Sequence, residues 1–182
     1  LSKNPNGEVK DCFETINRGI FAFNEGLRSV IFEPLAKGYL KLPSPVRTGT
    51  GNMLSNLGNV ITIPNNLLQG DLVLAIKNTA RFGVNTTIGI LGIFDPASKI
   101  GLNDYDREDY GQTLGRWGFK EGCYIVLPVL GPSTVRDTIA SIASFSGGDA
   151  WYNITVRNDT HYVSDFDYYF SRGATGVDFL AK

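Results

Sequence analysis

Residues 13–30, FETINRGIFAFNEGLRSV, carry the clearest structural pattern in this chain of 182 residues. Their apolar side chains recur every three or four positions, which is the spacing of one face of an α-helix. We therefore expect an amphipathic helix that ends at Pro34, because proline has no amide proton for a helical hydrogen bond. The apolar positions are Phe13, Ile16, Ile20, Phe23, Leu27 and Val30, and the polar face carries Glu14, Asn17, Arg18, Asn24 and Arg28.

Ser44 and Pro45 predict the start of a second helix. A serine N-cap followed by proline is a common start signal. The serine side chain accepts from a free amide of the first turn, and proline fits there because it needs no hydrogen bond and its fixed φ is helical. The helix is expected to run towards Asn59, with Pro64 as its limit.

Asp71 predicts the N-cap of a third helix, because its side chain can accept a hydrogen bond from a free amide of the first turn. This helix is expected to continue through residues 82–94, FGVNTTIGILGIF, and to stop at Asp95 and Pro96. An uncharged stretch of this length fits either a buried core helix or an interfacial segment, and both alternatives remain open. The loop that follows, residues 95–109, is longer than most loops, which favours a functional role.

Residues 123–130, CYIVLPVL, favour a short edge strand or an extended connector, since they are rich in β-formers but contain a proline. Ser133 is expected to cap the next helix, which Gly147 and Gly148 end. A last helix is expected over residues 165–181. The pattern as a whole predicts a mainly all-α fold.

The composition indicates one folded domain without a nucleic-acid partner. Lysine and arginine number 17 against 18 aspartate and glutamate, so the net charge is −1 and no basic surface dominates. Residues 1–12 are expected to be a flexible leader and residues 13–182 a single helical domain. His161 is the only histidine and no G-x-S-x-G motif is present, so we expect neither a multi-histidine metal site nor a hydrolase.

Two other groups of side chains are candidate sites. The acidic run Asp104, Asp106, Glu108 and Asp109 could wrap a calcium ion, but the EF-hand glycine is missing, so a solvated loop is favoured. Cys12 and Cys123 could form one disulfide in an oxidising compartment or remain two packed thiols, and both alternatives stay open.

Several motifs in a fixed order resemble the MlaA (VacJ) family of Gram-negative outer-membrane lipoproteins. The resemblance runs from about Phe13 to Asp137, and its most specific block, residues 108–118, reads EDYGQTLGRWG. The other matching positions are Asn17-Arg18, Phe21, Phe23 and Asn24; Pro43, Pro45 and Arg47; Asn52, Leu57, Asn59 and Pro64; Asn66 to Gly70; Arg81-Phe82, Asn85, Thr87, Gly89, Gly92 and Asp95; and Tyr124, Leu127-Pro128, Leu130 to Ser133 and Arg136-Asp137.

The resemblance implies a ring-like assembly of amphipathic helices, embedded in the outer membrane and facing the periplasm, with a central amphipathic channel. In the family's role, mislocalised glycerophospholipid from the outer leaflet enters this channel and passes to a soluble periplasmic carrier of the MlaC type, so that lipid asymmetry is maintained. Family members sit beside trimeric porins. The resemblance implies no enzyme, cofactor or metal.

Arg136 is the residue expected to meet the lipid head group, since a guanidinium pairs well with phosphate. The alternative is a pair between Arg136 and Asp137, or a neighbouring carboxylate, that only holds the fold.

The loop from Phe94 to Leu102 is expected to be a gate that packs against Ile20 and Phe23 and pivots at Gly92 and Gly101. Together, the residues expected to line or gate the channel are Ile20, Phe23, Phe94, Ile100, Leu102 and Arg136.

A second interpretation is a soluble periplasmic lipid-binding or adaptor protein of the same fold. Extraction separates the two, because an embedded ring should need detergent and an adaptor should not. The family's lipid-modified cysteine is expected in the full-length precursor and not in this chain, because no cleavage signal precedes Cys12.

Overall fold

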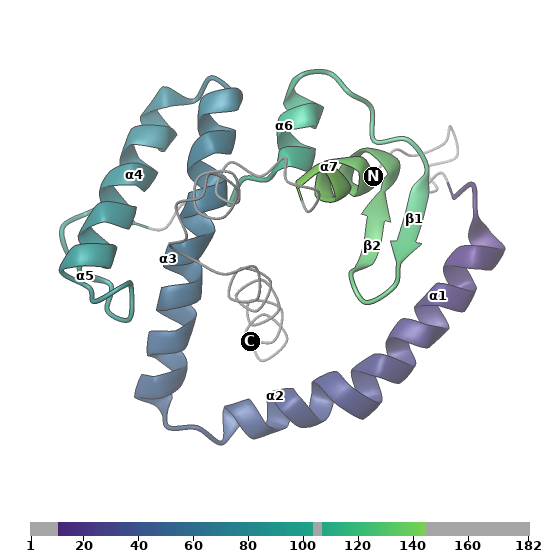
Figure 1. Ribbon diagram of the computed structural model, residues 1–182, viewed down its shortest axis with the longest axis horizontal. Coiled ribbons are helices and arrows are strands. Elements are labelled where there is room, and N and C mark those ends of the chain that lie inside the picture. Colours follow the sequence, from purple (N-terminus) through teal and green to yellow (C-terminus); the bar gives the residue numbers. More distant parts are fainter. Residues whose placement is uncertain (1–10, 104–106, 145–182) are drawn as a thin grey trace, which may run out of the picture.

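The computed structural model describes residues 11–103 and 107–144, and it is mainly helical, as predicted (Figure 1). A single two-stranded antiparallel sheet accompanies the helices. The elements are α1 (Glu14–Leu27), the π-helical turn η1 (Arg28–Phe32), α2 (Glu33–Leu40), α3 (Ser44–Leu68), α4 (Leu72–Thr87), α5 (Pro96–Lys99), α6 (Tyr110–Arg116), β1 (Tyr124–Leu127), β2 (Gly131–Thr134) and α7 (Val135–Ala143).

Contacts between neighbouring elements form a circuit that returns to its starting point. The helices α1, η1 and α2 form one curved arc, after which the chain turns a corner into α3 (Figure 1). Helix α3 packs on α4 and α6, α6 packs on α7, and α7 adjoins β2 of the hairpin. Strand β1 then packs on α1, which closes the circuit.

Pro34 does not end the first helix, so that prediction is wrong. It lies in the first turn of α2, where a proline is tolerated because the amide at that position needs no helical partner. The π-helical turn η1 precedes it, and the amide of Glu33 donates to the carbonyl of Arg28, five residues back. The polypeptide therefore stays helical from Glu14 to Leu40, apart from this change of pitch.

Pro64 does not limit the second helix either, because α3 continues through it to Leu68. The side-chain amide of Asn65 donates to the carbonyl of Ile61 at 2.8 Å, which adds a bond next to the interruption. Packing of α3 on α4 and α6 supports the helix on both sides of the proline. The N-cap is Pro43 rather than Ser44, and no side chain caps this end.

Helix α4 begins as predicted, with the Asp71 carboxylate accepting from the amide of Leu74 at 3.1 Å. It ends at Thr87, seven residues before the predicted stop at Phe94. The chain leaves the helix in left-handed conformations, with φ of 53° at Ile90, 57° at Leu91 and 91° at Gly92. The amide of Gly92 donates back to Asn85 at 2.8 Å, which closes the helix end.

The predicted strand over residues 123–130 is confirmed as β1, and its partner β2 was not predicted. Pro132 is compatible with β2 because this strand is at the edge of a two-stranded sheet. Ser133 belongs to β2, so Thr134 caps α7 instead, accepting from the amide of Asp137 at 3.2 Å.

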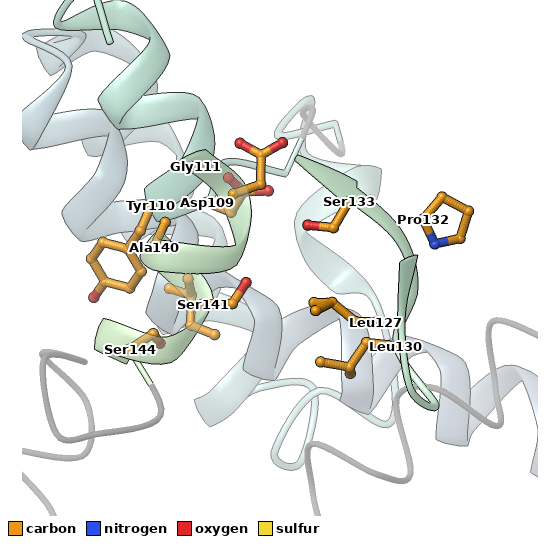
Figure 2. A pocket seen from close by; sticks show the side chains of 12 residues that line it. Asp109, Tyr110, Gly111, Leu127, Leu130, Pro132, Ser133, Ala140, Ser141 and Ser144 are labelled. Atoms are coloured by element: carbon orange, nitrogen blue, oxygen red, sulfur yellow. The ribbon is translucent and has the colours of Figure 1, made fainter. Parts of the chain in front are cut away.

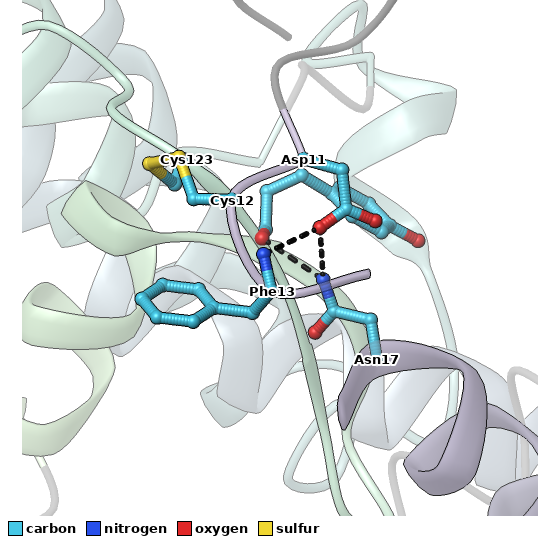
Figure 3. The surroundings of a disulfide bond; sticks show 6 residues. Asp11, Cys12, Phe13, Asn17 and Cys123 are labelled. Carbon is cyan, nitrogen blue, oxygen red and sulfur yellow. Dashed lines mark hydrogen bonds between the residues drawn. A yellow bond between two sulfur atoms is a disulfide. The ribbon is translucent and has the colours of Figure 1, made fainter. Parts of the chain in front are cut away.

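The remaining sequence predictions concern both ends of the chain and the acidic run. Residues 1–10, Asp104, Asp106, Gly147, Gly148 and the predicted helix 165–181 lie outside the described residues. Of the two alternatives for the cysteines, the structure has the disulfide, with the Cα atoms of Cys12 and Cys123 5.6 Å apart (Figure 3).

Candidate functional site

The interface between α3 and α4 is filled by amides and hydroxyls rather than by large apolar side chains. Asn78 donates to Asn66 at 2.8 Å, and Asn56 donates to Thr86 at 2.9 Å. The same polar interior extends to α6, where the hydroxyl of Thr113 donates to Asn65 at 2.6 Å. Such groups are stable in an interior because they are hydrogen-bonded to one another. The buried polar side chains here are Asn56, Asn59, Thr62, Asn65, Asn66, Asn78, Arg81, Asn85 and Thr113.

The outer surface has the opposite character, because large apolar side chains are exposed on α1, η1, α2, α3, α4 and α7. The residues include Phe13, Ile16, Phe21, Phe23, Val30, Ile31, Leu35, Leu67, Leu72, Val73, Ile76, Ile139 and Ile142. Exposed apolar surface of this extent indicates contact with a membrane or with partner proteins. Among residues 11–103 and 107–144, none of the helices is both long and apolar enough to cross a membrane.

Arg81 holds the segment after α4 in place. Its guanidinium is almost completely buried and donates to the carboxylate of Asp95 at 2.8 Å, to the hydroxyl of Ser98 at 3.0 Å and to the carbonyl of Leu102. Asn85 donates to the other oxygen of Asp95 at 2.9 Å and accepts from the amide of Ala97 at 3.0 Å. Residues 95–102 are therefore fastened to α4 by a polar network.

The electrostatics of Asp95 follow from this network. Burial raises the pKa of its carboxyl, but hydrogen bonds from Ser98, Arg81 and Asn85 outweigh burial and lower the pKa from 3.8 to about 2. Asp95 is thus ionised throughout the physiological pH range and is a permanent partner of Arg81.

Residues 88–94 form a compact turn whose large apolar side chains are exposed. Ile88, Ile90, Leu91 and Phe94 are each more than half exposed, and no charged residue lies between Arg81 and Asp95. The turn largely satisfies its own backbone, since the amide of Leu91 donates to Thr86 at 2.9 Å and that of Phe94 donates to Gly89 at 2.9 Å. A segment with paired amides and apolar side chains has the chemistry that a hydrocarbon environment requires.

A cavity of about 320 Å³ lies where α6, α7 and the hairpin meet α3 (Figure 2). Its lining is amphipathic, with the carboxylates of Asp109 and Asp137 and the hydroxyls of several serines beside apolar groups. In Figure 2, Ser133 and Ser141 lie near Leu127 and Leu130 of the hairpin. The full lining is Ile61, Asp109, Tyr110, Gly111, Leu127, Leu130, Pro132, Ser133, Asp137, Ala140, Ser141 and Ser144.

Arg136 lies beside this cavity but does not line it. Its Nε donates to Asp137 at 2.8 Å, and Asp137 lines the cavity. Gly115 makes room for the guanidinium, because a Cβ at that position would lie 2.7 Å from Nη1 of Arg136. The pair between Arg136 and Asp137, which was the alternative role predicted for Arg136 from the sequence, is thus present in the structure.

The structure does not bring the predicted gate and the first helix together. Helix α5 packs on α4, and α1 lies on the far side of the circuit (Figure 1). The predicted packing of residues 94–102 against Ile20 and Phe23 is therefore wrong in this conformation, because the Arg81 network attaches the segment to α4. Phe94 lines a second cavity of about 560 Å³, between the start of α3 and the 88–94 turn.

Two asparagines of α1 matter more than the sequence indicated. Asn17 donates to the carbonyl of Tyr124 at 3.1 Å and accepts from the amide of Val126 at 2.8 Å. Asn24 donates to the carbonyl of Leu127 at 2.9 Å and accepts from the amide of Val129 at 2.8 Å. Both are among the positions of the family resemblance, and they lie two helical turns apart on the polar face of the helix.

Comparison with known proteins places these features in a family. The model of the MlaA lipoprotein family matches residues 9–179. An uncharacterized protein of Rickettsia prowazekii is 41% identical over 169 residues, which are 91% of this chain and 64% of that protein. The intermembrane phospholipid transport system lipoprotein MlaA of Escherichia coli (strain K12) is 34% identical over 131 residues, 70% of this chain and 52% of that protein.

The fold agrees with these sequence matches. A solved structure, "Structural basis for maintenance of bacterial outer membrane lipid asymmetry", superposes with a TM-score of 0.75 at 28% identity, covering 94% of this chain and 83% of that one. The chain spans less than two thirds of the length of the curated relatives it matches. On the family match, the sequence identities and the shared fold together, the chain belongs to the MlaA lipoprotein family.

Proposed function

We propose that this chain forms the body of a phospholipid conduit in the Gram-negative outer membrane, beside a trimeric porin. It removes mislocalised glycerophospholipid from the outer leaflet and passes it to a soluble periplasmic carrier of the MlaC type, so that lipid asymmetry is maintained. The relatives named for intermembrane phospholipid transport support this proposal. The observation that carries it is the inverted distribution of side chains, with amides buried and large apolar groups exposed.

That distribution suits a ring of helices embedded in a bilayer. Exposed apolar side chains gain roughly 25 cal/mol per Å² on leaving water, so the outer surface favours contact with acyl chains. The buried amides of Asn65, Asn66 and Asn78 stay paired whatever surrounds the ring, because their partners belong to the same chain. The uncharged 88–94 turn, with its exposed Ile88 and Leu91, is the part of this surface that we expect to enter the lipid most deeply.

The amphipathic cavity provides a route for a molecule with a polar head and apolar tails. Ser133, Ser141 and Asp137 offer hydrogen bonds to a head group, while Leu127 and Leu130 offer an apolar wall to an acyl chain. Arg136, held beside the cavity by Asp137, is the cation that would meet the lipid phosphate as it passes.

The gate belongs to the same proposal. Phe94, Ile100 and Leu102 lie on the segment that Arg81 fastens to α4, and Ile20 and Phe23 lie on the opposite arc. Gating then requires the segment to leave the Arg81 network, with Gly92 and Gly101 as pivots, because both have positive φ.

Lipid transfer from proteoliposomes tests the proposal. The purified chain is reconstituted in vesicles that contain fluorescent phosphatidylethanolamine, and transfer to an added periplasmic lipid carrier is followed. Ser141→Trp, which fills the cavity, should lower the transfer rate about tenfold or more, whereas Ser29→Trp, on the exposed arc, should leave it unchanged. Equal rates for the two variants would overturn the proposed route.

Extraction provides the second test. A chain that is released from membranes by high salt without detergent, and that carries lipid in solution, would favour the soluble lipid-binding or adaptor protein instead.

A further inference from the structure

The junction between α1 and the hairpin has features that lipid transport alone does not require. The Cys12–Cys123 disulfide joins Cys12, two residues before α1, to Cys123, the residue before β1 (Figure 3). The carboxylate of Asp11 accepts from the amide of Phe13 at 2.9 Å and from Asn17 at 2.7 Å, and Asp11 itself forms a parallel bridge with Tyr124. We call this junction, with the Asn17 and Asn24 bonds to the hairpin, the seam.

The seam uses the free edge of β1. One edge of β1 pairs with β2, and the opposite edge offers the backbone groups of Tyr124, Val126 and Leu127. The side chain of Asn17 presents a carbonyl and an amide to this edge, as another strand would. Asn24 bonds in the same way to Leu127 at the end of β1 and to Val129 in the turn of the hairpin. Four hydrogen bonds thus join α1 to the hairpin, and one covalent bond lies at their end.

Within residues 11–103 and 107–144, few other bonds join the arc of α1, η1 and α2 to the rest of the chain. Asn17 is the only buried residue of these three elements. The ion pairs of the arc are internal, because Arg18 pairs with Glu14 and Arg28 pairs with Glu25 and Glu33. At the other end of the arc, the hydroxyl of Tyr39 donates to the carbonyl of Arg47 at 3.2 Å. The place of the arc in the circuit therefore depends on the seam.

We propose that the Cys12–Cys123 disulfide is a redox-dependent clasp that holds the circuit closed. Its formation takes two protons and two electrons from the two thiols, which a protein disulfide of the periplasmic thiol-oxidoreductase class accepts. A dithiol reverses the step by becoming a disulfide itself, and Cys12 lies at the surface where a dithiol can reach it. With the bond broken, the seam keeps only its hydrogen bonds, and the arc separates from the hairpin in a local opening.

Amide hydrogen exchange of the whole chain in detergent tests the clasp without any lipid. The amides of Val126 and Val129 donate to asparagine side chains of the seam, so their exchange reports its opening. The amide of Ala97 is a matched control, since it also donates to an asparagine side chain, that of Asn85, away from the seam. On adding dithiothreitol we expect about tenfold faster exchange at Val126 and Val129 and no change at Ala97.

The double variant Cys12→Ser, Cys123→Ser should show the fast exchange without reductant and should not respond to dithiothreitol. Reduction of the already folded chain keeps the test valid even if the variant folds poorly. Unchanged exchange at Val126 and Val129 after complete reduction, confirmed by titration of two thiols per chain, would overturn the clasp.

The consequence for transport rests on the proposed function. Reduction should lower phospholipid transfer about fivefold or more, and reoxidation should restore it, if a closed circuit is needed for the conduit. Absent transfer by the oxidised chain would refute the proposed function, while the exchange experiment would still decide the clasp.

Discussion

Asp95→Asn tests whether the polar network around Arg81 carries much of the stability of the α4–α5 region. The change keeps the shape of the side chain and removes its charge. Arg81, with a side chain only 6% exposed, then faces a neutral amide instead of a carboxylate. The fall of the Asp95 pKa from 3.8 to about 2 corresponds to about 2 kcal/mol, at ~1.36 kcal/mol per pKa unit. Because a quarter of the Asp95 side chain remains exposed to screening water, we expect a loss of about 1–2 kcal/mol.

Urea unfolding in detergent, followed by far-ultraviolet circular dichroism, measures this loss. Asp71→Asn is the matched control, because Asp71 caps α4 by accepting from the amide of Leu74, as Asp95 caps α5 by accepting from the amide of Ser98. Asparagine caps a helix about as well as aspartate, so the control should lose less than about 0.5 kcal/mol. Equal losses in the two variants would refute the role assigned to the Arg81–Asp95 pair.

The pH dependence of stability gives an independent check that the charge of Asp95 stabilises the folded state. The folded state lowers the pKa of Asp95, so its contribution is fully present above the unfolded value of 3.8 and is lost as the pH falls towards 2. The difference in stability between the parent chain and Asp95→Asn should therefore be constant from pH 7 to about pH 5 and shrink towards pH 2. A difference that stays constant down to pH 2 would show that ionisation of Asp95 is not its source.

Three further changes probe separate parts of the molecule. Gly92→Ala should cost about 2–4 kcal/mol in the same urea titration, because φ is 91° and the new Cβ would lie 2.5 Å from Cβ of Asn56; a neutral effect would mean that the turn can relax. Leu91→Asp should weaken partition into phospholipid vesicles about tenfold or more, measured by flotation, whereas Leu130→Asp, on the hairpin, should not; equal effects would contradict insertion of the 88–94 turn. Arg136→Ala should lower stability by about 1–3 kcal/mol, since the carboxylate of Asp137 loses the hydrogen bond from Nε of Arg136, and an unchanged urea midpoint would show that the pair is not structural.

Local signals in the sequence predicted part of the local structure, although the N-caps expected at Ser44 and Ser133 are Pro43 and Thr134. The Asp71 cap and the strand over residues 123–130 are confirmed, because each depends on a few neighbouring residues. The predictions that helices end at Pro34 and Pro64 were wrong, because the rule that proline breaks a helix assumes a helix without tertiary support. A π-helical turn precedes the first of these prolines, and tertiary packing supports the helix around the second.

The site was less predictable, since its parts come from distant segments. The bond between Asn17 and Tyr124 joins residues 107 positions apart, and no local pattern announces such a pair. The apolar face of α1 was recognised, but periodicity is the same for a face buried in a core and a face turned outward. The structure leaves Ile16 62% and Phe23 55% exposed, which the spacing alone did not show.

The asparagine-filled interface between α3 and α4 changes which mutations this protein can accept. A core of leucine and valine is stabilised by filling its volume, so one apolar side chain can often replace another of similar size. An interface of amides is held by direction, because each donor must point at its acceptor, and a shift of one helix along the other would leave buried dipoles without partners. Substitutions that are mild in most proteins, such as Asn78→Asp or Asn66→Leu, should therefore be severe here, while exchanges among the outward leucines and isoleucines should be nearly silent. Most proteins tolerate apolar substitutions in the interior and polar substitutions on the surface, and we expect the reverse in this molecule.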